Sequence, residues 1–305
     1  MKLIVGLIAR SSVSMFAAVV GLYIAAAESQ TNSRIDLTSP PHTGQVQFTG
    51  DDQRLIVDAQ HPPYSAIGKF RGALTCTASI VLHPRIIVTA GHCITKKDGT
   101  LKLSSLLFQP GYQAGIDLGD FEATVWAVGS KQSFRQQSVH DASQDWAILV
   151  LDRAPTGVQP FLLSRQSFEA LKFLKLKILM PSYSIDVADA EWVSLDPACS
   201  VRDTAWEALV HDCRASFGSS GAPLLTRDGP QYAIVGIHTG SMFASDSEGH
   251  VGRFVGNRAI SSGMFTEELL ALSRRLNSDS IHDVASQTYQ PQTQKFTARY
   301  SGVGE

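Results

Sequence analysis

The sequence predicts an all-β protein made of two antiparallel six-stranded barrels with one helix at the C-terminal end. Short apolar segments of strand length recur along the chain, and they are rich in valine, isoleucine and aromatic residues. Glycine, proline, aspartate and serine fall between these segments, as expected of turns. Strands and helices do not alternate, which favours a barrel or sandwich. The expected strands include Tyr64–Phe70, Ala73–Leu82, Arg85–Thr89, Thr124–Val128, Trp146–Leu151, Lys177–Met180 and Tyr232–His238.

One clear helical pattern lies near the end of the chain, over Phe265–Leu276. Thr266 is suited to cap its N-terminus. Glutamates in the first turn and arginines in the last turn suit the helix dipole. We therefore expect a single helix that docks on the β domain through one face. The apolar residues assigned mostly to that face are Phe265, Leu269, Leu270, Leu272 and Leu276.

Residues 1–27 have the pattern of a secretory signal peptide. Lys2 and Arg10 precede an apolar run that ends in the small residues Ala25-Ala26-Ala27, where cleavage is expected. The alternative is a retained membrane anchor, because the apolar region is long enough to span a bilayer. The small residues at the end of the apolar run favour cleavage, so the protein is predicted to be secreted or periplasmic.

Composition divides the remaining chain into three parts. Residues 28–49 are polar and turn-rich, which indicates a propeptide or linker. The globular domain is expected over residues 50–276. Residues 277–305 are polar and rich in glutamine, serine and threonine, which predicts a disordered tail.

Charge and spacing exclude some classes of partner. Charged residues make up 18% of the chain and the formal net charge is −2, so no basic face for nucleic acid is expected. The chain has no CxxC or HExxH spacing, and we expect neither a metal nor a cofactor.

The four cysteines predict two disulfides. An even number of cysteines in an exported protein favours disulfides, although four cysteines allow three pairings. Cys76 with Cys93, and Cys199 with Cys213, would each close a short local loop across a possible hairpin. Such a bond stabilises the fold by roughly 3 kcal/mol. The alternative, free buried thiols, is less favoured after export.

Three segments supply a histidine, an aspartate and a serine in that order. A serine hydroxyl is a poor nucleophile near neutral pH, and it needs a base whose tautomer is held by a partner. His92 is the candidate base, Asp145 the orienting carboxylate and Ser220 the nucleophile. Asp141 and Asp152 lie close to Asp145 in sequence and are alternatives to it. The segments are Thr89-Ala90-Gly91-His92-Cys93, Asp145-Trp146-Ala147-Ile148-Leu149 and Gly218-Ser219-Ser220-Gly221-Ala222-Pro223.

From about Gly50 to Leu276 the chain resembles chymotrypsin-fold, trypsin-like serine proteases, and especially their bacterial glutamyl-endopeptidase-like branch. The resemblance implies two β-barrels with the catalytic triad between them, and peptide-bond hydrolysis through an acyl-enzyme. The backbone N–H groups of Gly218 and Ser220 would form the oxyanion hole. Beyond the three segments above, it is carried by Gly50-Asp51-Asp52-Gln53-Arg54, Pro63-Tyr64-Ser65-Ala66-Ile67-Gly68, His211-Asp212-Cys213 and Gly236-Ile237-His238-Thr239-Gly240.

The resemblance also bears on specificity and maturation. His238, beside Thr239, matches the S1 histidine of glutamyl endopeptidases, which implies a partly charged imidazole and acidic P1 residues in peptide or protein substrates. The alternative is that His238 only packs. Arg214 either adds charge to this pocket or is solvated. Ser219 replaces the aspartate that pairs with a new N-terminus in zymogens, so maturation is expected to differ.

Two other functions compete with the serine endopeptidase. A catalytically silent protein of this fold would use the cleft or the tail as a docking surface, but the complete histidine, aspartate and serine set argues against it. An esterase would carry a G-x-S-x-G nucleophile followed by aspartate and histidine. Here the serine comes last in the chain, which disfavours that class.

Overall fold

The computed structural model describes residues 51–129, 141–166, 168–205, 208–229, 231–245 and 251–288. The predicted signal peptide at 1–27 and the propeptide or linker at 28–49 lie outside the described residues. Within the described ranges, no helix is both long and apolar enough to cross a membrane.

Six strands in the first half of the chain close into an antiparallel barrel. Their order around the barrel is β2-β3-β4-β7-β6-β5, and pairing of β2 with β5 closes it. The strands are β2 (Ile67–Arg71), β3 (Thr75–Ile80), β4 (Ile86–Thr89), β5 (Leu107–Pro110), β6 (Phe121–Val128) and β7 (Ala147–Leu151).

Six later strands close a second antiparallel barrel, in the order β9-β10-β11-β14-β13-β12. The ring closes where Leu225 of β12 pairs with Leu179 of β9. The predicted all-β fold of two six-stranded barrels is therefore confirmed. The strands are β9 (Lys177–Ser182), β10 (Ser194–Ala205), β11 (Ala208–His211), β12 (Pro223–Asp228), β13 (Gln231–Ser245) and β14 (Val251–Ser261).

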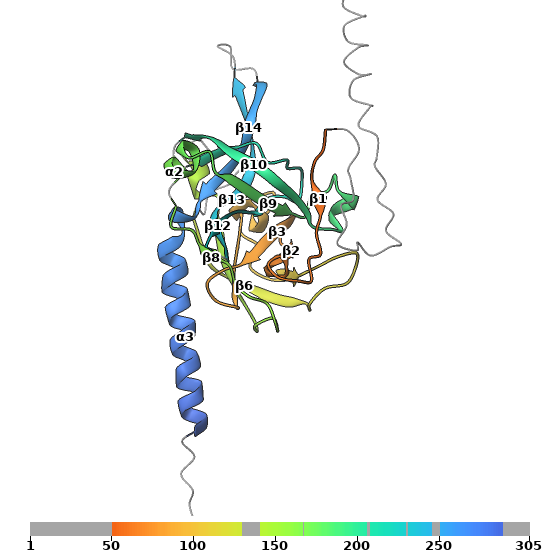
Figure 1. The fold of residues 1–305 in the computed structure, drawn as a ribbon. Coiled ribbons are helices and arrows are strands. Elements are labelled where there is room, and N and C mark those ends of the chain that lie inside the picture. The colour runs from red at the N-terminus through yellow and green to blue at the C-terminus, as the bar shows by residue number, and fades with distance from the viewer. Residues whose placement is uncertain are drawn as a thin grey trace, which may run out of the picture.

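Shorter elements extend this framework (Figure 1). The two-residue strands β1 (Leu55–Ile56) and β8 (Leu162–Leu163) pair with β10 and β13, respectively. A short helix, α2 (Phe168–Phe173), precedes β9. The 3-10 helices are η1 (Tyr64–Ala66), η2 (Gly91–Ile94), η3 (Asp141–Gln144), η4 (Ala188–Ala190) and η5 (Ser262–Met264).

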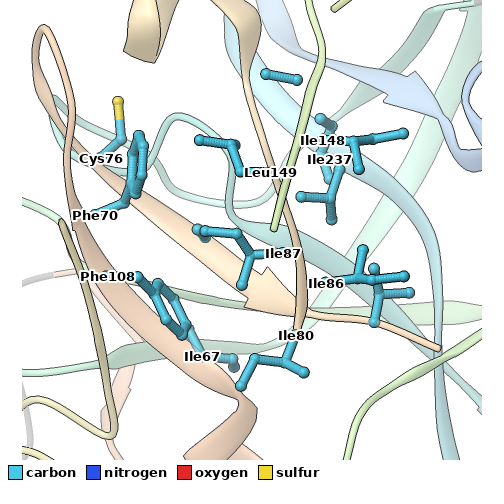
Figure 2. Packing of buried hydrophobic residues seen from close by; sticks show 14 of the residues in the cluster. Ile67, Phe70, Cys76, Ile80, Ile86, Ile87, Phe108, Ile148, Leu149 and Ile237 are labelled. Atoms are coloured by element: carbon cyan, nitrogen blue, oxygen red, sulfur yellow. The ribbon is translucent and has the colours of Figure 1, made fainter. Parts of the chain in front are cut away.

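Branched aliphatic and aromatic side chains fill the first barrel (Figure 2). Ile67, Ile80, Ile87 and Phe108 are fully buried there. Ile237 of β13 belongs to the same apolar cluster, although it comes from the second barrel. Because interiors of this kind are close-packed, this shared core fixes how the two barrels sit against each other.

The C-terminal helix α3 (Thr266–Thr288) docks on the core through the predicted face, with one correction. Leu269 and Leu272 are buried, whereas Leu270 is 41% exposed because it lies a third of a turn away from the docked face. The helix also continues past the predicted end at Leu276, since no glycine or proline interrupts residues 277–288. The first part of the expected disordered tail is therefore helical. Residues 289–305 lie outside the described residues.

Both expected disulfides are present. Cys76–Cys93 joins β3 to η2, and Cys199–Cys213 joins β10 to the segment that follows β11. The first bond lies immediately beside His92, so it ties the turn that carries this histidine to the wall of the first barrel.

Docking of α3 predicts unequal effects of two neighbouring substitutions. Leu272→Ala removes a buried side chain and is expected to lower the free energy of unfolding by about 2–5 kcal/mol. Leu270→Ala is the matched control and is expected to change it by less than about 0.5 kcal/mol. Denaturant unfolding measures both values, and equal losses would contradict this docking.

Candidate active site

Two paired strands of the first barrel bring His92 and Asp145 together. β4 ends at Thr89 and β7 begins at Ala147, and these two residues are register partners. His92 lies in the 3-10 turn that follows β4, while Asp145 lies two residues before β7. The strand register thus places side chains that are 53 residues apart in sequence next to each other.

Both carboxylate oxygens of Asp145 are held by His92. The backbone N–H of His92 donates to Oδ1, and the ring Nδ1 lies 2.8 Å from Oδ2. Asp145 is 3% exposed, whereas His92 is 22% exposed and lines an open cleft. Burial alone would lower the pKa of His92, but the charge and hydrogen bond of Asp145 raise it above its ordinary value.

Of the alternative aspartates, Asp152 forms a surface ion pair with Arg153. The side chain of Asp141 lies outside the described part of the chain. Asp145 is therefore the described carboxylate that contacts His92.

Ser220 comes from the second barrel, on the loop between β11 and β12. Thr77 of β3 fastens this loop to the first barrel. Its N–H donates to the Ser220 carbonyl at 2.9 Å, and its hydroxyl donates to the Gly218 carbonyl at 2.9 Å. The same hydroxyl accepts the N–H of Tyr183 at 3.0 Å. The loop therefore spans the junction of the barrels.

Two glycines allow this loop to approach neighbouring backbone closely. Gly218 has φ +92°, and a Cβ there would lie 2.3 Å from the carbonyl oxygen of Tyr183. Gly221 has φ +82°, and its Cβ would lie 2.2 Å from the carbonyl oxygen of Thr77. Left-handed backbone and these contacts both require glycine.

The backbone of the same loop presents two hydrogen-bond donors. The carbonyl of Phe217 accepts the N–H of Ile185 at 2.7 Å, so the N–H of Gly218, across a trans peptide, points the other way. Among the described residues, neither this N–H nor that of Ser220 has a protein acceptor. Two open donors close together in one loop suit an anionic oxygen.

A cleft of about 860 Å³ gathers these groups. His92 faces it from the first barrel, and Gly218, Ser220, His238 and Thr239 face it from the second. The structure therefore brings the predicted base, nucleophile, oxyanion donors and S1 residues to one cavity.

Solved protease structures share this architecture. A Glu endopeptidase aligns with a TM-score of 0.55 over 74% of this chain and 98% of its own, at 21% identity. The chain has the chymotrypsin-like serine protease fold. The protease Anisep from Arthrobacter nicotinovorans gives a TM-score of 0.48 at 16% identity, over 65% of this chain and 90% of its own. The serine protease AL20 gives a TM-score of 0.47 at 16% identity, over 65% of this chain and 91% of its own.

No family model matches the sequence, and no curated protein matches it either. The likeness to the Glu endopeptidase structure supports the chymotrypsin-like fold.

In this chymotrypsin-like fold, His238 contacts a second buried histidine. Its Nδ1 lies 3.2 Å from Nε2 of His211, and the two rings meet edge to face. Burial lowers the pKa of His211 to about 4 and that of His238 well below its usual range. Burial therefore favours the neutral form of both rings, and a charged His238 beside a substrate carboxylate stays a prediction. In the sequence, His211 stood out only as part of the motif His211-Asp212-Cys213, which gave it no role.

Two arginines differ in their relation to the cleft. Arg214 is half exposed, lies 3.7 Å from Asp52 and does not line the cleft, in agreement with the solvated alternative.

Arg258 of β14 was not predicted as part of the site. Its Nε donates to Thr239 Oγ1 at 3.1 Å, and its Nη2 lies 3.9 Å from Asp145 Oδ2. Arg258 therefore places positive charge behind the cleft.

One group of metal-ligand residue types occurs among the described residues, formed by Cys76, His92 and Cys93. The two sulfurs are bonded to each other in a disulfide. They are not thiolates, and metal binding requires the thiolate form. This group is therefore not a metal site.

The neutral burial of His211 predicts a pH dependence of stability. Its folded pKa, about 4, lies below the unfolded value of about 6.5, so the unfolded state binds more protons between these pH values. The stability that depends on a neutral His211 is fully present above pH 6.5 and is lost as the pH falls toward 4. At pH 5 the loss is about 2 kcal/mol.

We expect His211→Gln to lose less stability than the wild type between pH 7.5 and pH 5. Thermal unfolding at several pH values measures this difference, and the deficit of the variant should shrink as the pH falls. A deficit that stays constant across this range would contradict neutral burial of His211.

Proposed function

We propose that this protein is a secreted serine endopeptidase that hydrolyses peptide bonds through an acyl-enzyme on Ser220. The observation that carries the proposal is the buried Asp145–His92 pair in a cleft that also holds Ser220 and two open backbone N–H donors. Secretion is supported by the two disulfides, because such bonds persist in oxidising compartments.

The reaction follows from these groups. Ser220 Oγ attacks the peptide carbonyl carbon while His92 Nε2 takes the hydroxyl proton, and the carbonyl oxygen becomes anionic. The N–H groups of Gly218 and Ser220 stabilise this oxygen. His92 then protonates the leaving amine, which leaves an ester on Ser220, and water cleaves this ester by the same steps. Asp145 stays ionised and holds the ring.

Peptides with an acidic residue at P1 are proposed as the preferred substrates. Nδ1 of His238 faces His211, so Nε2 is the nitrogen that remains for a substrate in the cleft. A carboxylate placed there raises the pKa of His238 and favours the charged ring. Arg258, bonded to Thr239, adds positive charge nearby. The Glu endopeptidase of similar fold agrees with this preference.

A fluorophosphonate probe tests the nucleophile. Folded wild-type protein is expected to take up one probe molecule, found on Ser220 by peptide mass spectrometry, because the hydroxyl is activated by His92. Ser220→Ala should take up none, and Ser241→Ala serves as the control that keeps the label. An unlabelled wild type, or label that persists in Ser220→Ala, would refute the proposal.

Matched peptides test the P1 preference. A peptide with Glu at P1 is expected to exceed its Gln counterpart in kcat/KM by about tenfold or more, since the two differ in charge and hardly in shape. His238→Gln should remove most of this difference, while His61→Gln, an exposed control, should keep it. Equal rates for Glu and Gln in the wild type would refute acidic preference.

A further inference from the structure

The residue before the proposed nucleophile is anchored by hydroxyl groups. Ser219 is fully buried, and its Oγ lies 3.1 Å from Ser184 Oγ and 3.2 Å from Ser182 Oγ. The N–H of Ser216 approaches the same Oγ at 3.4 Å. Ser219 is therefore the point at which the nucleophile loop is fixed to the segment 182–186.

The hydrogen bonds of this anchor have a defined direction. Ser184 Oγ lies 2.6 Å from Asp186 Oδ1, and an ionised carboxylate can only accept. The single hydroxyl proton of Ser184 is therefore donated to Asp186, and Ser184 accepts from Ser219. Ser219 therefore donates to Ser184, and Ser184 donates to the carboxylate of Asp186.

Arg54 holds that carboxylate. Its Nη1 and Nη2 donate to the two oxygens of Asp186 at 3.1 Å and 2.8 Å, an arrangement that fixes the carboxylate plane. Arg54 is 4% exposed while Asp186 is 44% exposed, so the arginine is the fixed partner. It also binds Asp52 and directly precedes β1, which pairs with β10.

The segment held by Arg54 also shapes the oxyanion donors. The N–H of Ile185 binds the carbonyl of Phe217, which turns the N–H of Gly218 toward the cleft. Gly218 lies directly against the carbonyl of Tyr183. A shift of residues 182–186 therefore moves the Phe217–Gly218 peptide as well as Ser219.

We propose that Arg54 is a positioning residue that keeps the Gly218 and Ser220 N–H groups in place through Asp186, Ser184 and Ser219. This inference rests on the proposed protease function. The positive charge in this arrangement is the Arg54 side chain, which belongs to the domain itself. Ser219, which lacks a carboxylate, is joined to the cation through Ser184 and Asp186 instead.

The test compares rates of fluorophosphonate labelling across pH 5–9. Arg54→Met is expected to lower the plateau rate by about tenfold to 10²-fold, because the donors at the reacting oxygen are displaced. The midpoint of the pH profile should not move, because the His92–Asp145 pair is untouched. Arg54→Lys should recover part of the rate, since lysine restores the charge without the two-pronged geometry.

Two controls separate positioning from general stability. Leu272→Ala lowers stability through the docking of α3, outside this loop, and should keep the wild-type rate. Arg153→Met removes a surface ion pair with the same expectation. Ser184→Ala interrupts the link while leaving the Arg54–Asp186 pair intact, and it should also lower the plateau. If Arg54→Met does not fold, Ser184→Ala alone tests the inference.

A wild-type plateau in folded Arg54→Met or in Ser184→Ala would overturn the inference. A shifted midpoint would do the same, because Arg54 would then act on the triad. An Arg54→Lys rate as low as that of Arg54→Met would also contradict a role for the charge. Failure of the wild type itself to label would reject the protease function and this inference together, whereas the other results leave the protease function standing.

Discussion

The site depends first on one buried carboxylate. Asp145 is almost fully enclosed, and an ionised group in that position is costly unless it is hydrogen-bonded. His92 supplies both bonds, one from its backbone and one from its ring. Those bonds require the turn after β4 to lie beside the start of β7. The strand register of the first barrel therefore determines the orientation and the pKa of His92.

The second barrel completes the cleft because its loop that carries Ser220 is built against the first barrel. Thr77 donates to two carbonyls of that loop, and the absence of a side chain at Gly221 lets the loop lie against the carbonyl of Thr77. The continuous core, which Ile237 joins from β13, makes this contact rigid. Chemistry that uses residues from both barrels is possible because of this junction.

Local patterns in the sequence were sufficient for part of this account. Apolar runs between turns predicted five strands of the first barrel but not β5, and compact motifs predicted His92, Asp145 and Ser220. Strands β10 and β14 were not expected, since charged and polar residues interrupt their apolar pattern. Arg54 and Arg258 were missed for another reason. Their roles come from partners far away in sequence, and a single polar residue in a strand or loop carries no signal of such contacts.

Measurement of the His92 pKa tests the central claim most directly, and it needs no substrate. We expect an NMR titration of the His92 ring to give a midpoint above 6.5, because the charge of Asp145 outweighs burial. In Asp145→Asn the midpoint should fall below 6.5, since burial and the charge of Arg258 then act without opposition. A wild-type midpoint at or below 6.5, or one that Asp145→Asn leaves unchanged, would contradict the account.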